Sequence, residues 1–275
     1  MKILIVSPKN KTVYNFRGDL IKDMIAAGNE VYVTGPNRDF YDEIIGLGVK
    51  EFFEIPLVKD NTNPRGDLQY LNNLTGCMKT LKPDLVFSYT VMPVIYGSLA
   101  ASRAGVKQIY GMITGLGRAY SAKGRKAKFV RSITKALYKP ALKKCRKVIF
   151  QNPDDAEQLI QMGCLSRDKV ELVNGSGVNL DRFQRTPLPE QTVFLMVSRI
   201  IREKGIMEYC KAAQTVKKDH PQVRFILLGA FDHAIGGMAP ETIREYTDSG
   251  VIELSGEVDD PVEYYQSSSV FVLPS

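Results

Sequence analysis

Two cations lie close together where a predicted strand ends and a predicted helix begins. Arg199 follows the strand predicted over residues 193–197, and Lys204 lies in the first turn of the helix predicted over residues 203–218. A guanidinium, an ammonium and the free N–H groups of a helix N-terminus all attract anions. The pattern suits a pyrophosphate group, and two solvated loop cations are the alternative interpretation.

Two Gly-x-Gly turns follow predicted strands, at residues 115–117 and 175–177. Glycine lets the backbone approach a ligand closely, but it also serves ordinary tight turns, so both interpretations stay open. Neither turn has the third glycine of the dinucleotide fingerprint, and the sequence contains no Walker A loop. NAD binding and ATP hydrolysis are therefore not expected.

The sequence lacks the histidine, cysteine and carboxylate motifs of common enzyme classes. It contains two histidines, no His-Glu-x-x-His, no nucleophile elbow and no Cys-x-x-Cys. No Asp-x-Asp is present to hold a divalent cation, so we expect no metal. The four scattered cysteines predict reduced thiols, as in a cytosolic protein.

The positive charge is concentrated in one segment. Residues 85–153 contain 14 Lys or Arg and no Asp or Glu. The rest of the chain therefore has the other 23 of the 37 basic residues and all 30 acidic residues. Twelve of the 14 lie in residues 118–147. An ordinary surface helix packed on a sheet is one interpretation, but the absence of acids favours an amphipathic helix on anionic lipid. Nucleic acid is not expected as a partner, because no recognised binding module accompanies the charge.

Short apolar runs alternate with helical patterns along the whole chain, and no apolar run is long enough to span a membrane. Strands are predicted over residues 3–6, 30–34, 85–88, 108–110, 148–150, 193–197, 224–228, 251–254 and 270–273. Helices are predicted over residues 18–27, 67–81, 93–104, 126–144, 203–218, 240–249 and 261–267. The alternation is interrupted at residues 183–190, which contain two prolines. We therefore expect an α/β fold of two doubly wound, Rossmann-like domains, residues 1–180 and 190–275.

A series of short motifs runs along the whole chain: Tyr14–Arg17, Asn63–Leu68, Ile95–Ala100, Thr114–Gly117, Phe150–Asn152, Gly175–Asn179 with Phe183, and Ser198–Gly205. In combination they resemble the motifs of the family-4 glycosyltransferases of the GT-B fold. The most similar group adds a sugar to a polyprenyl-diphosphate-linked saccharide in capsule, O-antigen or protein-glycan assembly.

The resemblance implies transfer of a hexosyl or N-acetylhexosaminyl unit from a nucleotide-sugar, usually UDP-linked, to a lipid-linked saccharide acceptor. It implies retention of anomeric configuration, no metal and no other cofactor, and a peripheral location on the cytoplasmic face of the membrane. The donor-binding residues that it implies are Gly177, Ser198, Arg199, Lys204, Gly229 and Val258. The acceptor-binding residues that it implies are Asn15, Arg17, Gly115, Leu116 and Gly117.

The chain also departs from the family pattern. The family's Glu-x7-Glu element follows a Val-Leu-Pro-Ser sequence, and here that sequence ends at Ser275. We therefore expect an incomplete second domain and no sugar transfer by these 275 residues, and no catalytic residue is assigned. Met92 stands where the group often has lysine, and Asn179 stands where aspartate is common. The alternative function is a non-catalytic protein that binds a nucleotide or a polyprenyl diphosphate.

Overall fold

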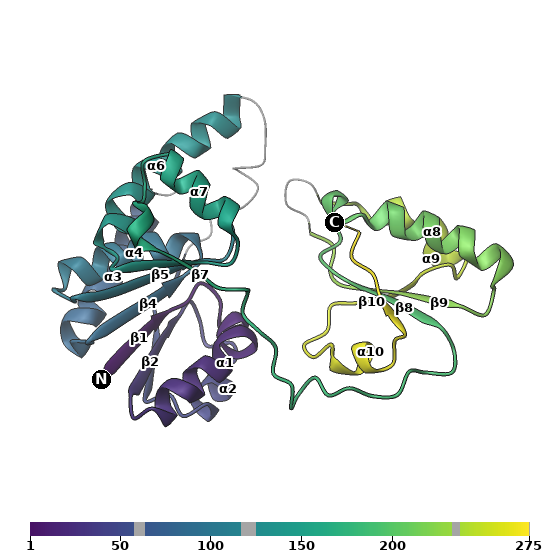
Figure 1. Cartoon of the computed structure of the whole chain (residues 1–275), viewed down its shortest axis with the longest axis horizontal. Helices are drawn as coiled ribbons and strands as arrows, with labels where there is room; N and C mark the ends of the chain where they lie inside the picture. The colour runs from purple at the N-terminus through teal and green to yellow at the C-terminus, as the bar shows by residue number, and fades with distance from the viewer. Residues whose placement is uncertain (58–63, 117–124, 233–236, 275) are drawn as a thin grey trace. The chain divides into compact units, whose positions relative to one another are not determined.

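The computed structural model describes residues 1–57, 64–116, 125–232 and 237–274, with the backbone alone for residues 125–131. The chain divides into two compact units, Met1–Val178 and Asn179–Ser275. Each unit has a parallel sheet covered by helices, as Figure 1 shows, and each is described by itself. The expected α/β fold with doubly wound parallel sheets is confirmed.

The N-terminal unit is built on a parallel sheet in the order β3-β2-β1-β4-β5-β6-β7. The order reverses between β1 and β4, and ligands of such sheets bind beyond the carboxyl ends of the strands at this reversal. The strands are β1 (Lys2–Val6), β2 (Glu30–Gly35), β3 (Glu51–Glu54), β4 (Leu85–Tyr89), β5 (Gln108–Ile113), β6 (Lys147–Phe150) and β7 (Val170–Leu172).

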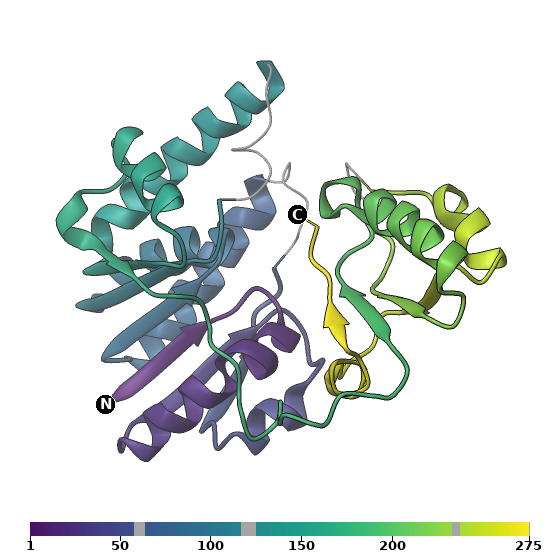
Figure 2. The same ribbon diagram turned by 45° about the vertical axis from the view of Figure 1, so that its right-hand side comes forward.

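Helices cover both faces of this sheet. Figure 2 shows α1 and α2 below the sheet and α3, α4 and α6 above it. The helices are α1 (Asn10–Ala26), α2 (Tyr41–Gly46), α3 (Pro64–Leu81), α4 (Val91–Arg103), α6 (Arg125–Lys144) and α7 (Pro153–Gln161), with a 3-10 turn η1 (Arg167–Lys169). Successive residues of a strand face opposite sides, so Ile3 and Ile5 pack in the cluster under α1 while Leu4 and Val6 pack under α4. Because both faces are buried, β1 is apolar at every position of this run.

The C-terminal unit has a parallel sheet in the order β10-β9-β8-β11, which reverses between β8 and β11. Its strands are β8 (Val193–Val197), β9 (Arg224–Leu228), β10 (Glu253–Gly256) and β11 (Val270–Phe271). Its helices are α8 (Ile206–Asp219), α9 (Arg244–Asp248) and α10 (Val262–Gln266), with 3-10 turns η2 (Arg202–Lys204) and η3 (Pro240–Ile243). One apolar cluster lies under α8 and the other lies beside α10.

The pattern analysis missed several short elements and misplaced some ends. Its predicted ranges omit α2, β3 and β7, which have too few residues to show a clear period, and they also omit α7. It predicted a single helix over residues 203–218, but Gly205 adopts φ 74° and separates η2 from α8. It also began α1 at residue 18, whereas the helix begins at Asn10. The buried face of this early part contains the polar side chains of Asn10 and Arg17, which hide the apolar period.

Candidate functional site

The predicted donor residues of the C-terminal unit gather at the carboxyl end of β8. Ser198 and Arg199 follow this strand, and Lys204 ends η2 just before α8. Pro274, which follows β11, lies against the same turn, since a Cβ added to Gly205 would meet the Cβ of Pro274 at 2.6 Å. The turn of residues 198–205, called here the β8–α8 turn, therefore lies where the strand order reverses, as expected for a ligand site.

Arg199 is held by a carboxylate that the sequence analysis did not identify. Its Nη1 donates to Oδ2 of Asp232 at 2.8 Å, and the Arg199 side chain is still 63% exposed. One hydrogen bond uses one of the five guanidinium N–H groups, so the others can reach a ligand. The ammonium of Lys204 has no hydrogen-bond or ion-pair partner in the described part of the chain. Asp232 lies in the loop that follows β9. Its position after a predicted strand is the sequence feature that could have indicated it as a candidate site residue.

Gly229 packs directly against the β8–α8 turn. A Cβ added to Gly229 would lie 1.9 Å from the carbonyl oxygen of Ser198, and Gly229 has φ 150°. Its N–H donates to the carbonyl of Gly256 at 2.7 Å, and the N–H of Ser198 donates to the carbonyl of Leu228 at 3.0 Å. The ends of β8, β9 and β10 are therefore joined through main-chain contacts that only glycine permits at position 229.

Val258 also follows a strand, but its side chain has a packing role. It is half-buried against the apolar cluster of Val193, Leu195, Ile226 and Leu228. The structure therefore packs Val258 against the central strands β8 and β9, and its predicted contact with the donor stays a prediction.

Four polar side chains meet at the carboxyl edge of the N-terminal sheet, at the reversal between β1 and β4. The phenol oxygen of Tyr89 lies 2.7 Å from Oγ of Ser7 and 2.9 Å from Oγ1 of Thr12. The guanidinium carbon of Arg17 lies 5.0 Å from the centroid of the Tyr89 ring. Ser7 directly follows β1 and Tyr89 ends β4, so both come from the loops that bind ligands in such sheets. The sequence analysis named Arg17 but missed the other three residues.

Arg17 is buried, with 5% of its side chain exposed. Its Nη1 donates to the carbonyl of Phe16 at 2.6 Å and to Oγ of Ser176 at 3.0 Å, and its Nη2 contacts the sulfur of Met112 at 3.3 Å. Ser176 also accepts a hydrogen bond from Nε2 of Gln151 at 2.8 Å. Burial lowers the pKa of the Arg17 guanidinium, and the nearby Tyr89 acts in the opposite direction. Arg17 thus joins α1 to the loop of residues 175–177.

The remaining predicted residues of the N-terminal unit have different surroundings. Asn15 is half-buried on α1, Gly115 has φ 151° after β5, and Leu116 is buried in the core. Gly117 lies outside the described residues. Gly177 has φ 72° and belongs to the N-terminal unit, whereas the other predicted donor residues belong to the C-terminal unit. Its predicted position near the donor phosphates therefore stays a prediction.

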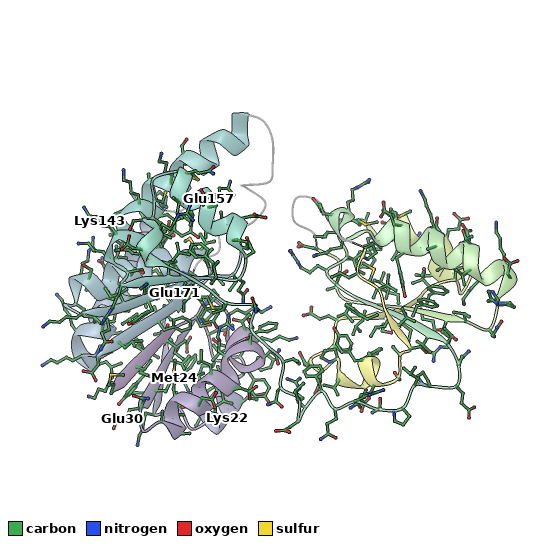
Figure 3. All side chains as sticks on the ribbon, viewed as in Figure 1. Lys22, Met24, Glu30, Lys143, Glu157 and Glu171 are labelled. Atoms are coloured by element: carbon green, nitrogen blue, oxygen red, sulfur yellow. The ribbon has the colours of Figure 1, made fainter. Side chains whose placement is uncertain are left out.

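The helix α6 carries the described part of the cationic segment. Lys135, Lys139 and Lys143 are exposed and recur every four residues, so they lie along one side of the helix. None of them has an ion-pair partner among the described residues. Lys147 differs, because its ammonium lies 2.7 Å from Oε1 of Glu171 on β7. Figure 3 labels Lys143 and Glu171, which lie on these two elements.

The buried stripe of α6 differs from the one that the helical period predicts. The helical period predicts a stripe of Phe129, Ile133, Leu137 and Ala141, of which the Phe129 side chain lies outside the described residues. Ile133 is 46% exposed, whereas Leu137 packs against the core and Ala141 is buried. Tyr138 and Leu142 are fully buried instead, beside Ala141. The contacts of α6 with α4 select this stripe.

No helix among the described residues has both the length and the apolar character needed to cross a membrane. No group of three or more His, Cys, Asp or Glu side chains in the described ranges is placed to hold a metal ion.

Two doubly wound sheets with polar groups at their carboxyl edges define the GT-B class of fold. A solved sucrose-phosphate synthase from Thermosynechococcus elongatus shares this fold, with a TM-score of 0.75 and 17% identity, over 100% of this chain and 75% of that chain. Both halves of the sequence match glycosyl transferase family models. A model described as "Glycosyl transferase 4-like" matches residues 2–152, and one described as "Glycosyl transferases group 1" matches residues 178–275. The chain belongs to the glycosyl transferase 4-like family, and its function is glycosyl transfer.

Two characterised proteins are similar in sequence. An N,N'-diacetylbacillosaminyl-diphospho-undecaprenol alpha-1,3-N-acetylgalactosaminyltransferase from Campylobacter jejuni is 28% identical over 100% of this chain and 74% of its own length. A UDP-Gal:alpha-D-GlcNAc-diphosphoundecaprenol alpha-1,3-galactosyltransferase from Escherichia coli is 26% identical over 88% of this chain and 63% of its own length. The expected GT-B fold and glycosyltransferase family are therefore confirmed.

Proposed function

We propose that this glycosyltransferase moves a sugar from a UDP-sugar to a saccharide carried on a polyprenyl diphosphate. The observation that carries this proposal is that both similar transferases are named for acceptors on a diphospho-undecaprenol carrier. One is named for N-acetylgalactosamine transfer and the other for galactose transfer, so we propose a hexosyl or N-acetylhexosaminyl unit. The corresponding pathway class is assembly of capsule, O-antigen or protein-linked glycan.

We propose that the β8–α8 turn binds the donor diphosphate. Arg199 is exposed and oriented by Asp232, while Lys204 lies beside the N-terminus of α8. Together they supply two positive charges toward the negative charge that develops on the leaving UDP. This provides the charge balance that a divalent cation gives in other transferases, so we propose transfer without a metal. Retention of configuration is proposed separately, from the resemblance to the family.

The acceptor is proposed to bind at the carboxyl edge of the N-terminal sheet. Asn15 and Arg17 on α1 and the segment of residues 115–117 after β5 supply the contacts. Arg17 lies at the strand-order reversal of this sheet, where ligands of doubly wound folds bind.

The test is a transfer assay with the purified gene product, a panel of UDP-sugars and a diphosphate-linked saccharide acceptor. We expect transfer from one hexose or N-acetylhexosamine donor, no loss of rate with EDTA, and retained configuration in the product. Nucleotide binding without transfer from any donor would favour the non-catalytic alternative.

We also propose that α6 binds the protein peripherally to anionic lipid on the cytoplasmic face. Replacing Lys135, Lys139 and Lys143 with Gln is expected to weaken binding to anionic vesicles by at least about tenfold, because a cation near such a surface contributes about 1 kcal/mol. Vesicle co-sedimentation at low and high salt measures the effect.

The control for this prediction replaces Lys22, Lys79 and Lys107 with Gln. These exposed residues lie in the same unit, so the variant has the same net charge but an intact α6. An equal loss in both variants, or equal binding to neutral vesicles at high salt, would contradict a specific role of α6.

A further inference from the structure

Arg17 is a buried cation whose described contacts are all to neutral groups. The carbonyl of Phe16, the hydroxyl of Ser176, the sulfur of Met112 and the ring of Tyr89 surround its guanidinium. No carboxylate pairs with it among the residues that the structure describes. Buried charges in proteins are normally paired, since removing a charge from water is costly.

The unsatisfied part of the guanidinium is one particular edge. Nη1 donates two hydrogen bonds, to Phe16 and Ser176, whereas Nε is buried and has no acceptor among the described residues. In the part of the chain that the structure describes, the one acceptor at Nη2 is the thioether of Met112, and a thioether is a weak acceptor. Nε and Nη2 together form an edge that matches the two oxygens of a phosphate or a carboxylate.

The position of this edge points to a substrate group. Tyr89 and Met112 lie at the carboxyl ends of β4 and β5, and Ser176 lies in the loop after β7. Ser7 and Thr12 add hydroxyl groups around Tyr89 at the same edge of the sheet. Met112 is an unbranched side chain that can change rotamer readily, so it can move away and expose Nε and Nη2.

We propose that the Nε–Nη2 edge of Arg17 binds two oxygens of a substrate diphosphate, with Met112 displaced. This proposal rests on the proposed function for the identity of the substrate, which we take to be the lipid-linked acceptor. UDP carries the same diphosphate chemistry, so the experiment must separate the two sources. The bound anion would neutralise the buried charge and satisfy the two N–H groups.

The first experiment uses a chain in which Arg199 and Lys204 are both replaced with Ala, which removes the proposed donor phosphate site. Calorimetry with inorganic pyrophosphate and with farnesyl diphosphate then measures the affinity of the remaining proposed site, at Arg17. Adding Arg17→Lys keeps the charge but removes the paired N–H groups. We expect it to weaken binding of both probes by at least about tenfold, which corresponds to about 1.4 kcal/mol. Arg103→Lys, at the exposed end of α4, is the matched control and is expected to change neither affinity.

A second comparison assigns the source of the diphosphate. In the chain that keeps Arg199 and Lys204, Arg17→Lys is expected to leave UDP affinity unchanged. A loss of UDP affinity, together with unchanged farnesyl diphosphate affinity, would overturn the acceptor assignment.

Two further measurements separate binding from a structural role. Ser176→Ala keeps Arg17 but removes its bond to the loop of residues 175–177, and we expect pyrophosphate affinity to stay the same. In the unsubstituted chain, pyrophosphate is expected to shift the NMR resonance of the Arg17 Nε–H group, which needs no substitution at Arg17. Equal pyrophosphate affinity with and without Arg17→Lys, or an equal loss with Ser176→Ala, would overturn the proposal. Failure of the proposed function would look different, since pyrophosphate would still bind at Arg17 while no donor supported transfer.

Discussion

Replacing Arg199 or Lys204 with Ala is expected to weaken UDP binding by at least about tenfold and to leave uridine binding nearly unchanged. Each replacement removes a charge-assisted contact worth about 1.5–3 kcal/mol, and about 1.4 kcal/mol corresponds to a tenfold change in affinity. The loss is expected to be larger for Arg199, because Asp232 then loses the guanidinium that balances its charge beside the diphosphate. Calorimetric titration with UDP and with uridine measures both effects.

The matched control is Arg202→Ala. Arg202 is an exposed cation in η2, between the two predicted ligands, so this variant tests whether any charge in the β8–α8 turn suffices. We expect UDP affinity to change less than about twofold, since a solvated charge contributes little. If all three variants lose UDP and uridine affinity equally, then the donor site is assigned wrongly.

Replacing Gly229 with Ala is expected to destabilise the C-terminal unit by about 3 kcal/mol and to reduce UDP affinity. The new Cβ would lie 1.9 Å from the Ser198 carbonyl oxygen and 2.9 Å from its carbonyl carbon. Both are backbone atoms, so no side-chain rotation can relieve the contact. The β8–α8 turn must therefore move, and it carries both predicted phosphate ligands. Denaturant unfolding of the variant measures the loss of stability.

Gly250→Ala is the control for this prediction. Gly250 has φ 70°, and nothing lies within 4 Å of a Cβ added there, so the substitution carries the conformational cost without the contact. We expect it to cost about 1–2 kcal/mol. It should leave UDP affinity unchanged, because Gly250 lies before β10 and away from the carboxyl ends of the strands. Equal losses of stability in the two variants would show that the close approach to Ser198 is unimportant.

The sequence alone determined the architecture, because apolar periodicity reports local geometry. The strands Val193–Val197 and Arg224–Leu228 have the predicted bounds, since largely buried strands of a parallel sheet contain continuous apolar runs, here residues 193–197 and 225–228. The short Tyr41–Gly46 helix and the Glu51–Glu54 strand were missed, because a run of four to six residues does not show one period clearly.

Only the tertiary structure decided how the candidate residues are used. The family motif of residues 14–17 names Arg17 as an acceptor-site residue, but only the folded sheet shows that it is buried against Tyr89, 72 positions further along the chain. Asp232 meets Arg199 because β8 and β9 are parallel neighbours, so the loops after both strands leave the same edge of the sheet. The family resemblance names Gly229 as a donor-site residue, but only the structure shows that the backbone of Ser198 occupies the place of its missing side chain. Contacts of this kind depend on strand order and register, which bring together residues that are far apart in the sequence. Because their spacing follows no regular period, the sequence pattern does not predict such contacts.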